Sequence, residues 1–160
     1  AVAGLALADM GGIKGRGQRH VLELEGGEAL LIDESYNANP ASMAATLKSL
    51  GSEAARRRIA VLGPMRELGE HADALHAGLA EHVVAAQVER LILIGEDMAP
   101  LHNAVDGKVA VDRVGSVEEA SDLLLSILRD GDAVLVKASN SVGLAKLVDR
   151  VAGEPATCST

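Results

Sequence analysis

The sequence is nearly devoid of aromatic residues: Tyr36 is the only one among 160 residues, and there is no Phe and no Trp. Proteins that bind single-stranded nucleic acid by stacking need several aromatic side chains on which successive bases lie. Basic residues are also in the minority, with 15 Lys and Arg against 23 Asp and Glu and a formal net charge of −8. Because non-specific nucleic-acid binding depends on Lys and Arg beside phosphates, both deficits argue against that class of protein.

Cysteine and long apolar runs are scarce as well. The one cysteine, Cys158, cannot form a disulfide within the chain, which fits a reducing compartment. No apolar run approaches the ~20 residues that span a bilayer, and no basic segment leads into an apolar stretch at the N-terminus. A single domain of this length buries roughly 68–70% of the surface that its unfolded chain exposes. We therefore expect a cytoplasmic globular domain with an aliphatic core.

The spacing of apolar residues predicts an α/β fold. Short, almost wholly apolar runs, typical of strands covered by helices on both faces, alternate with segments of helical spacing. Strands are predicted at residues 58–63, 90–95, 109–114 and 133–137, and helices at residues 41–51, 71–87, 116–131 and 141–151. Ser116 and Glu119 have the spacing of a capping box at the start of the third helix. The predicted architecture is a Rossmann-like, mostly parallel sheet with helices on both faces.

The first part of the chain follows a different pattern. Residues 19–34 predict an N-terminal β-hairpin with Gly26 and Gly27 at its turn. Before the hairpin, residues 1–12 are mostly small and apolar and predict a short helix that stops at its two final glycines. Because this helix has no visible partner, we interpret the chain as a fragment of a longer protein. Residues 153–160 show no periodicity and are predicted to form a disordered tail.

Three polar segments follow predicted strands, at residues 34–40, 64–71 and 138–141. In open parallel sheets, ligands bind beyond the carboxyl ends of the strands, so these segments predict one binding site. The alternative is that they are polar only because they are loops. Asn37 and Asn39 can both donate and accept hydrogen bonds and are candidates to bind a peptide or a carboxylate. The alternative for this pair is an Asx turn followed by a helix cap.

Lys137 follows an apolar strand directly, and Ser139 lies two residues beyond it. A lysine at the end of a buried strand is a candidate to hold a carboxylate or a phosphate. The alternative is a side chain that extends along the apolar surface until its ammonium group reaches solvent. For Glu67 and Glu70 the simpler interpretation is that acidic residues are favoured near the start of a helix.

Several common signatures are absent or misplaced. Residues 15–17, Gly-Arg-Gly, precede a strand and do not join a strand to a helix, so we reject them as a dinucleotide fingerprint. His71, His76 and His82 are spread around the axis of the predicted helix, and we expect surface residues and no metal site. The sequence contains no GxxxxGK[ST] phosphate loop, and no Ser-His-Asp arrangement can be assigned from spacing.

The most specific motifs are LIDESYNANPASM, IAVLGPMRELGEH and VLVKASNSVGLAKLV, which begin at residues 31, 59 and 134. In order and spacing they resemble the C-terminal domain of the ATP-dependent Mur ligases, over about residues 15–151. The YNANP segment resembles the corresponding segment of the Mur ligase family member that adds D-alanyl-D-alanine to UDP-N-acetylmuramoyl-tripeptide. The resemblance implies that residues 1–14 are the end of a central ATPase domain and its linker, and that residues 15–152 are the C-terminal domain.

The resemblance also implies a cytoplasmic enzyme of peptidoglycan synthesis, in which the missing central domain binds ATP and Mg²⁺. ATP phosphorylates the tripeptide carboxylate, the amine of D-Ala-D-Ala attacks the acyl phosphate, and the tetrahedral intermediate collapses to amide, ADP and phosphate. No catalytic residue and no metal ligand is expected in this domain. Family matching places Arg16, Asp33 and Tyr36 on the nucleotide side. On the substrate side it places Asn37, Asn39, Met65, Glu67, Leu68, Lys137 and Ser139.

The chain departs from the family pattern at three positions. Pro64 stands where the family usually has the Asp of LGDM, and Ala138 and Asn140 replace the Gly and Arg of KGSR. The first change removes a carboxylate and a backbone donor, and the last removes a positive charge. The competing interpretation is a stand-alone α/β module of receiver or flavodoxin type that binds a small ligand or regulates a partner. The single Tyr36 disfavours flavin binding, which uses flanking aromatic residues.

Overall fold

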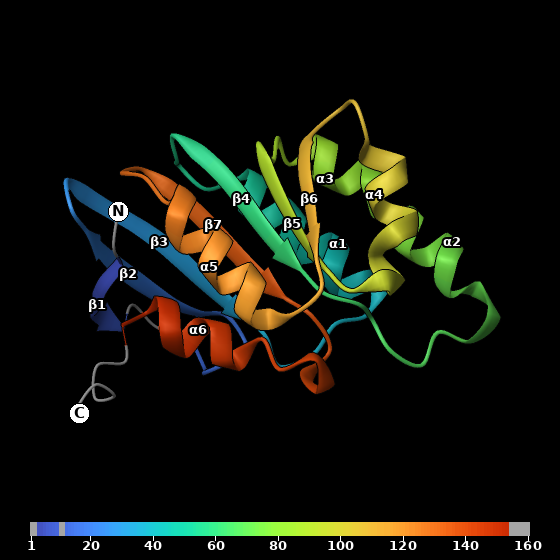
Figure 1. The fold of residues 1–160 in the computed structure, drawn as a ribbon, viewed down its shortest axis with the longest axis horizontal. Coiled ribbons are helices and arrows are strands. Elements are labelled where there is room, and N and C mark those ends of the chain that lie inside the picture. The colour runs from blue at the N-terminus through green and yellow to red at the C-terminus, as the bar shows by residue number, and fades with distance from the viewer. Residues whose placement is uncertain (1–2, 10–11, 154–160) are drawn as a thin grey trace.

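The computed structural model of the chain describes residues 3–9 and 12–153. Within these residues, seven strands form one sheet in the spatial order β1-β2-β3-β7-β4-β5-β6 (Figure 1). The strands are β1 (Ala3–Asp9), β2 (Gln18–Leu24), β3 (Gly27–Glu34), β4 (Arg57–Leu62), β5 (Arg90–Ile94), β6 (Ala110–Val114) and β7 (Asp132–Lys137). From β3 to β6 all neighbours are parallel, whereas β2 is antiparallel to both β1 and β3. The predicted Rossmann-like, mostly parallel sheet with an N-terminal hairpin is confirmed.

Helices cover both faces of this sheet (Figure 1). They are α1 (Pro40–Gly51), α2 (Ala72–Ala77), α3 (Ala80–Ala85), α4 (Ala99–Val105), α5 (Val117–Ile127) and α6 (Ala145–Val151), with short 3₁₀ turns η1 (Gly69–His71), η2 (Glu96–Met98) and η3 (Asn140–Val142). One aliphatic cluster joins the sheet to α1, α3 and α4 through residues such as Leu47, Val83 and Leu101. The other joins the sheet to α5 and α6 through Leu124 and Leu147. Because β4, β5 and β7 contribute to both clusters, these strands are apolar on both faces.

The N-terminal segment corrects the sequence-based expectation of a helix. Residues 3–9 form β1, which pairs antiparallel with β2 through Ala3 opposite Leu24 and Asp9 opposite His20, with irregular register between them. Without β1, the outer edge of β2 would present unpaired backbone N–H and C=O groups. A run of small apolar residues can form either a helix or a strand, and pairing with β2 stabilises the strand. Residues 154–160 of the predicted disordered tail lie outside the described residues.

The helix predicted at residues 71–87 is in fact three elements, η1, α2 and α3. The interruption falls at Gly78 and Leu79, where the amide of Leu79 donates to the carbonyl of His76 in a tighter 3₁₀-type turn. Glycine in a helix interior is disfavoured by its backbone entropy, which makes this position a natural break. The break lets α2 pack against α4, while α3 packs against both α1 and α4.

The turn of the hairpin and the cap of α5 differ from prediction by small shifts. Gly27 pairs with Leu24, so the two turn residues are Glu25 and Gly26, one position earlier than predicted. The side chain of Ser116 accepts from the amide of Glu119 as expected, but the Glu119 carboxylate accepts from the amide of Gly115. The predicted capping box is therefore only half formed. No helix in the described residues is long and apolar enough to cross a bilayer.

Candidate functional site

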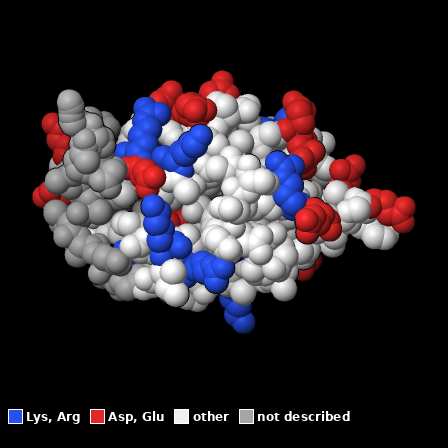
Figure 2. All heavy atoms as spheres, turned by 90° about the horizontal axis from the view of Figure 1, so that it is seen from below, with Lys and Arg blue, Asp and Glu red and all other residues white. Residues whose placement is uncertain are grey.

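The carboxyl ends of β3, β7 and β4 lie side by side, with Glu34 opposite Lys137 and Lys137 opposite Leu62. The three polar segments singled out in the sequence therefore leave the sheet at one edge. Figure 2 shows the molecule from below, where a band of Lys and Arg runs left of centre and Asp and Glu dominate toward the right end. In a chain of net charge −8, this band is a local concentration of positive charge.

Asp33 closes the end of β3 and is completely buried, with 0% of its surface exposed. Its Oδ2 accepts from the amide of Gly15 at 2.9 Å, and its Oδ1 accepts from the amide and the hydroxyl of Ser35. Two backbone bonds support this contact: the amide of Gly17 donates to the carbonyl of Asp33, and the amide of Tyr36 donates to the carbonyl of Gly15. The carboxylate therefore fastens the segment before β2 across the end of β3.

Arg16 and Tyr36 form an exposed stacked pair beside Asp33. The guanidinium carbon of Arg16 lies 3.9 Å from the centroid of the Tyr36 ring, which is cation–π geometry. Gly15 has a φ of +78°, and a Cβ there would lie 3.1 Å from the Cβ of Tyr36, so glycine permits this close approach. The structure thus brings together Arg16, Asp33 and Tyr36, the residues predicted for the nucleotide side.

Lys137 is buried, with only 3% exposed, and its Nζ donates to the carbonyl of Asn37 at 2.9 Å. The side chain reaches into the β3–α1 loop, so it does not extend to solvent as the alternative interpretation required. Burial lowers the pKa of Lys137 below its usual value, and the Glu34 carboxylate partly offsets that shift. Burial raises the pKa of Glu34, an effect that Lys137 opposes and Asp33 reinforces.

The two asparagines of the β3–α1 loop have different surroundings. Asn39 caps α1: its Oδ1 accepts from the amide of Ser42 at 2.8 Å, and the hydroxyl of Ser42 accepts from the amide of Asn39. The helix-cap alternative therefore describes the side-chain oxygen of Asn39. Asn37 is exposed and offers its carbonyl to Lys137. Ser139 is buried and donates its amide to the carbonyl of Pro64.

The loop after β4 is attached to its neighbours at several points. The amide of Gly63 donates to the carbonyl of Lys137 at 2.9 Å, and Met65 is buried in the aliphatic cluster. The guanidinium of Arg66 donates to the hydroxyl of Ser141 in η3 and to the carboxylate of Asp97 in η2. The other residues of this loop that were predicted for the site are Glu67 and Leu68. Glu67 is exposed and has a φ of +58°, and Leu68 is half-buried.

The departures from the family pattern have visible structural consequences. The carbonyl of Pro64 accepts from Ser139, so the loop keeps a tie to the end of β7. Ala138 is completely buried, and its Cβ lies 2.7 Å from where a Cβ on Gly63 would stand. The two residues are therefore matched in size. Asn140 is exposed at the start of η3.

Sequence reasoning missed two residues at this edge. Glu34 is half-buried beside Lys137, and its position at a strand end was the available signal. His76 was expected on the surface, but only 2% of it is exposed. Its helical spacing to the buried Leu79 and Val83 was the available signal. His71 is exposed as expected, and the described residues contain no cluster of three or more His, Cys, Asp and Glu that could hold a metal ion.

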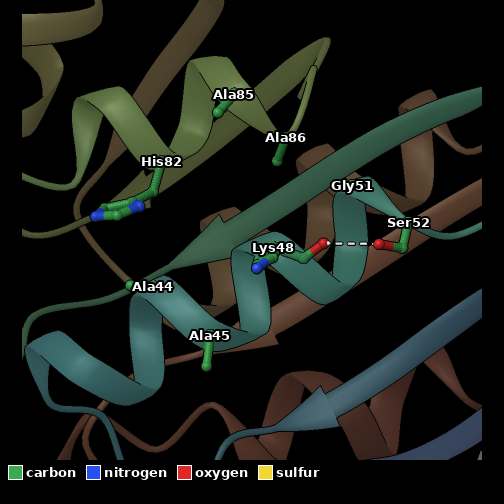
Figure 3. Close-up of a pocket in the computed structure, with 8 residues that line it drawn as sticks. All are labelled: Ala44, Ala45, Lys48, Gly51, Ser52, His82, Ala85 and Ala86. Carbon is green, nitrogen blue, oxygen red and sulfur yellow. Dashed lines mark hydrogen bonds between the residues drawn. The ribbon is translucent and has the colours of Figure 1, made fainter.

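A separate pocket of about 540 Å³ lies between α1 and α3 (Figure 3). Its lining consists of Ala44, Ala45, Lys48, Gly51, Ser52, His82, Ala85 and Ala86. None of the predicted site residues contributes to it. The pocket is therefore distinct from the loops at the strand ends.

Comparison with known proteins identifies the family. The family described as "Mur ligase, glutamate ligase domain" matches residues 15–140. UDP-N-acetylmuramoyl-tripeptide--D-alanyl-D-alanine ligase of Mycobacterium tuberculosis (strain CDC 1551 / Oshkosh) is 36% identical over an alignment that covers 89% of this chain and 32% of the relative. The corresponding ligase of Synechocystis sp. is 34% identical over 147 residues, covering 90% and 31%.

The fold is also shared with solved structures. The MurF ligase of Thermotoga maritima in complex with ADP aligns with a TM-score of 0.72 at 23% identity, covering 91% of this chain and 32% of that one. This chain thus spans about a third of the length of the relatives that it matches. Because the family match covers most of its residues, the chain belongs to the Mur ligase family and contains the family's glutamate ligase domain.

Proposed function

We propose that this chain is the C-terminal substrate-binding part of an ATP-dependent ligase that joins D-Ala-D-Ala to UDP-N-acetylmuramoyl-tripeptide in peptidoglycan synthesis. The observation that carries the proposal is the meeting of all three motif segments at the ends of β3, β7 and β4. Relatives that bear this activity in their names match 89% or more of the chain at 34–36% identity. The family match favours this function over a stand-alone receiver or flavodoxin module.

In this proposal the chemical step is shared between domains. ATP and Mg²⁺ are held mainly by a central domain, and residues 15–152 close over the reacting groups in the cytoplasm. The central domain supplies the phosphorylation of the tripeptide carboxylate. This chain orients the incoming dipeptide so that its amine attacks the acyl phosphate, and such positioning lowers the entropic part of the barrier.

The nucleotide side of the proposed site is the stacked pair of Arg16 and Tyr36. Asp33 acts on the same side by holding Gly15, because its oxygens accept from that segment and from Ser35. Arg16 is one residue beyond Gly15, so the carboxylate determines where the guanidinium stands. Asp33 is in this sense a positioning residue.

The dipeptide side is formed by the loops after β3, β4 and β7. Lys137 supplies the positive charge that attracts the dipeptide carboxylate, with Ser139 and the two asparagines, Asn37 and Asn39, beside it. Charge of this sign is needed locally because the chain as a whole is acidic. The loop after β4 contributes Glu67 and Leu68 to this side, and Met65, which is buried in the aliphatic cluster, anchors the loop.

The first test compares the chain alone with the full-length protein. With UDP-MurNAc-tripeptide, D-Ala-D-Ala, ATP and Mg²⁺, the full-length protein releases ADP and forms the amide product, and the chain alone does neither. Absence of product from the folded full-length protein refutes the proposed function. Turnover by the chain alone refutes the division of roles between the domains.

The second test replaces Lys137 in the full-length ligase. We expect Lys137→Ala to raise the KM for D-Ala-D-Ala by about 10- to 100-fold, the equivalent of a charge-assisted hydrogen bond of roughly 1.5–3 kcal/mol, with a smaller change for ATP. Lys146→Ala, which removes an exposed lysine from α6, is the matched control. Wild-type dipeptide kinetics in the Lys137 variant exclude this lysine from the dipeptide site.

A further inference from the structure

His76 links α2 to the loop that follows β4. The ring is buried, and both of its nitrogens have partners: Nδ1 lies 2.8 Å from the carbonyl of Ala72, and Nε2 lies 3.0 Å from the amide nitrogen of Met65. Ala72 contributes only an acceptor and Met65 only a donor. The ring is therefore neutral, with its proton on Nδ1 and its lone pair on Nε2 directed at the loop.

The bond to Met65 completes a series of attachments along one short stretch of backbone. The amide of Gly63 donates to the carbonyl of Lys137, and the carbonyl of Pro64 accepts from the amide of Ser139, so the end of β7 holds one side of the stretch. His76 holds the next residue from the opposite side. Proline lacks an N–H, so the amide of Met65 is the first backbone donor after Gly63.

The loop residues predicted for the dipeptide side lie just beyond this stretch. Glu67 comes two residues after Met65 and has a φ of +58°, a backbone conformation that non-glycine residues adopt only when their surroundings impose it. Arg66, between them, is attached to η2 and η3 by exposed bonds of 3.2 Å, which are weaker restraints than a buried one. The buried bond from His76 is therefore the main restraint on the loop from the side of α2.

We infer that His76 is a positioning residue for the incoming dipeptide: its Nε2 lone pair holds the amide of Met65 and thereby sets the position of Glu67 and Leu68. This role rests on the proposed function, since those two residues belong to the proposed dipeptide side. His76 itself is buried and touches no substrate.

Two polar variants test the contacts of the two ring nitrogens of His76 separately. In His76→Gln, the side-chain oxygen reaches the position of Nε2 and accepts from Met65, whereas in His76→Asn the shorter amide serves only Ala72. His76→Leu keeps the volume and loses both contacts. His82→Asn, on the more exposed α3, is the control for a histidine outside this contact.

The experiment measures the full-length ligase carrying each variant. Loss of the Met65 bond in the Asn variant raises the KM for D-Ala-D-Ala about 3- to 10-fold with the KM for ATP unchanged, and the Gln variant stays within about 2-fold of wild type. Hydrogen–deuterium exchange of the peptide that contains residues 63–68 is faster in the Asn variant than in the Gln variant. The control behaves as wild type.

Equal KM values for D-Ala-D-Ala in the Asn and Gln variants refute the positioning role. It is also refuted if the rise in KM across the variants follows their melting temperatures and not the presence of an acceptor for the amide of Met65. If the Leu variant does not fold, the Asn and Gln pair still decides. If the wild-type full-length protein forms no product, the proposed function fails. The exchange measurement then still shows whether His76 holds the loop.

Discussion

Replacing Asp33 by alanine removes the acceptor for three hydrogen bonds at the end of β3. The amide of Gly15 and the amide and hydroxyl of Ser35 all donate to this carboxylate, which is completely buried. The variant therefore leaves donors in a region from which water is excluded. We expect Asp33→Ala to be among the more destabilising single changes in this chain.

The magnitude follows from the character of these bonds. Hydrogen bonds to a charged group contribute about 1.5–3 kcal/mol each, but three bonds that share one carboxylate are not additive. Each buried donor that is left without an acceptor costs about 1–3 kcal/mol, so for the three donors together we expect a loss of about 3–5 kcal/mol. In a chain of this length that corresponds to a fall in melting temperature of roughly 6–20 °C.

Three further variants make the measurement specific. Asp33→Asn keeps an oxygen for Ser35 but turns an NH₂ toward the amide of Gly15, so it should lose about 1–3 kcal/mol. Ser35→Ala removes one donor and leaves the carboxylate bonded to two amides, at a cost of about 1 kcal/mol. Asp112→Ala removes an exposed carboxylate that pairs with Arg90 on the sheet edge, and should cost at most about 1 kcal/mol.

Thermal melting followed by circular dichroism gives the order Asp33→Ala, Asp33→Asn, Ser35→Ala, Asp112→Ala, from most to least destabilised. A fall of less than about 2 °C for Asp33→Ala, or one no larger than that of Asp112→Ala, would show that Gly15 and Ser35 find other acceptors. The carboxylate would then not hold Gly15 in place, and its proposed action on the nucleotide side would have no physical basis.

Three other changes have definite expected outcomes. Asp132→Ala leaves the largely buried Arg57 without the carboxylate that accepts from its Nε and Nη2, and urea denaturation should show a loss of about 3–5 kcal/mol. Because burial raises the pKa of Glu34, the folded state holds its proton more tightly than the unfolded chain, so this group's stabilising contribution is present at low pH and is lost as pH rises through its raised pKa. The free energy of unfolding of the wild type should therefore contain a fall just above pH 4.5 that is missing in Glu34→Gln, whose side chain does not titrate. Identical pH profiles of unfolding free energy for the two proteins would contradict this expectation. Gly63→Ala places a Cβ 2.7 Å from the Cβ of Ala138, which should cost about 1–3 kcal/mol and be relieved by Ala138→Gly in the double variant.

Local sequence pattern was sufficient for most of the architecture and for the meeting of the three polar segments at one edge of the sheet. The apolar runs at β4, β5 and β7 indicate strands buried on two faces, because only such strands have no polar side. Parallel strands place all their carboxyl ends on one edge, so the polar residues that follow β3, β4 and β7 had to meet there. The start of α1 was also readable from the Asn-Pro pair at residues 39 and 40.

Contacts between residues far apart in the chain decided the rest. Residues 3–9 are a strand because β2 offers an unpaired edge, and no local property of the segment requires that. Lys137 turns inward because the carbonyl of Asn37, 100 residues earlier, lies within reach. Asp33 bonds to Gly15 because the chain doubles back across the end of β3. His76 is buried because the break after α2 lets that helix pack inward, where the amide of Met65 needs an acceptor. In each case the hydrogen-bond partner is supplied by the tertiary structure, and spacing along the sequence carries no record of it.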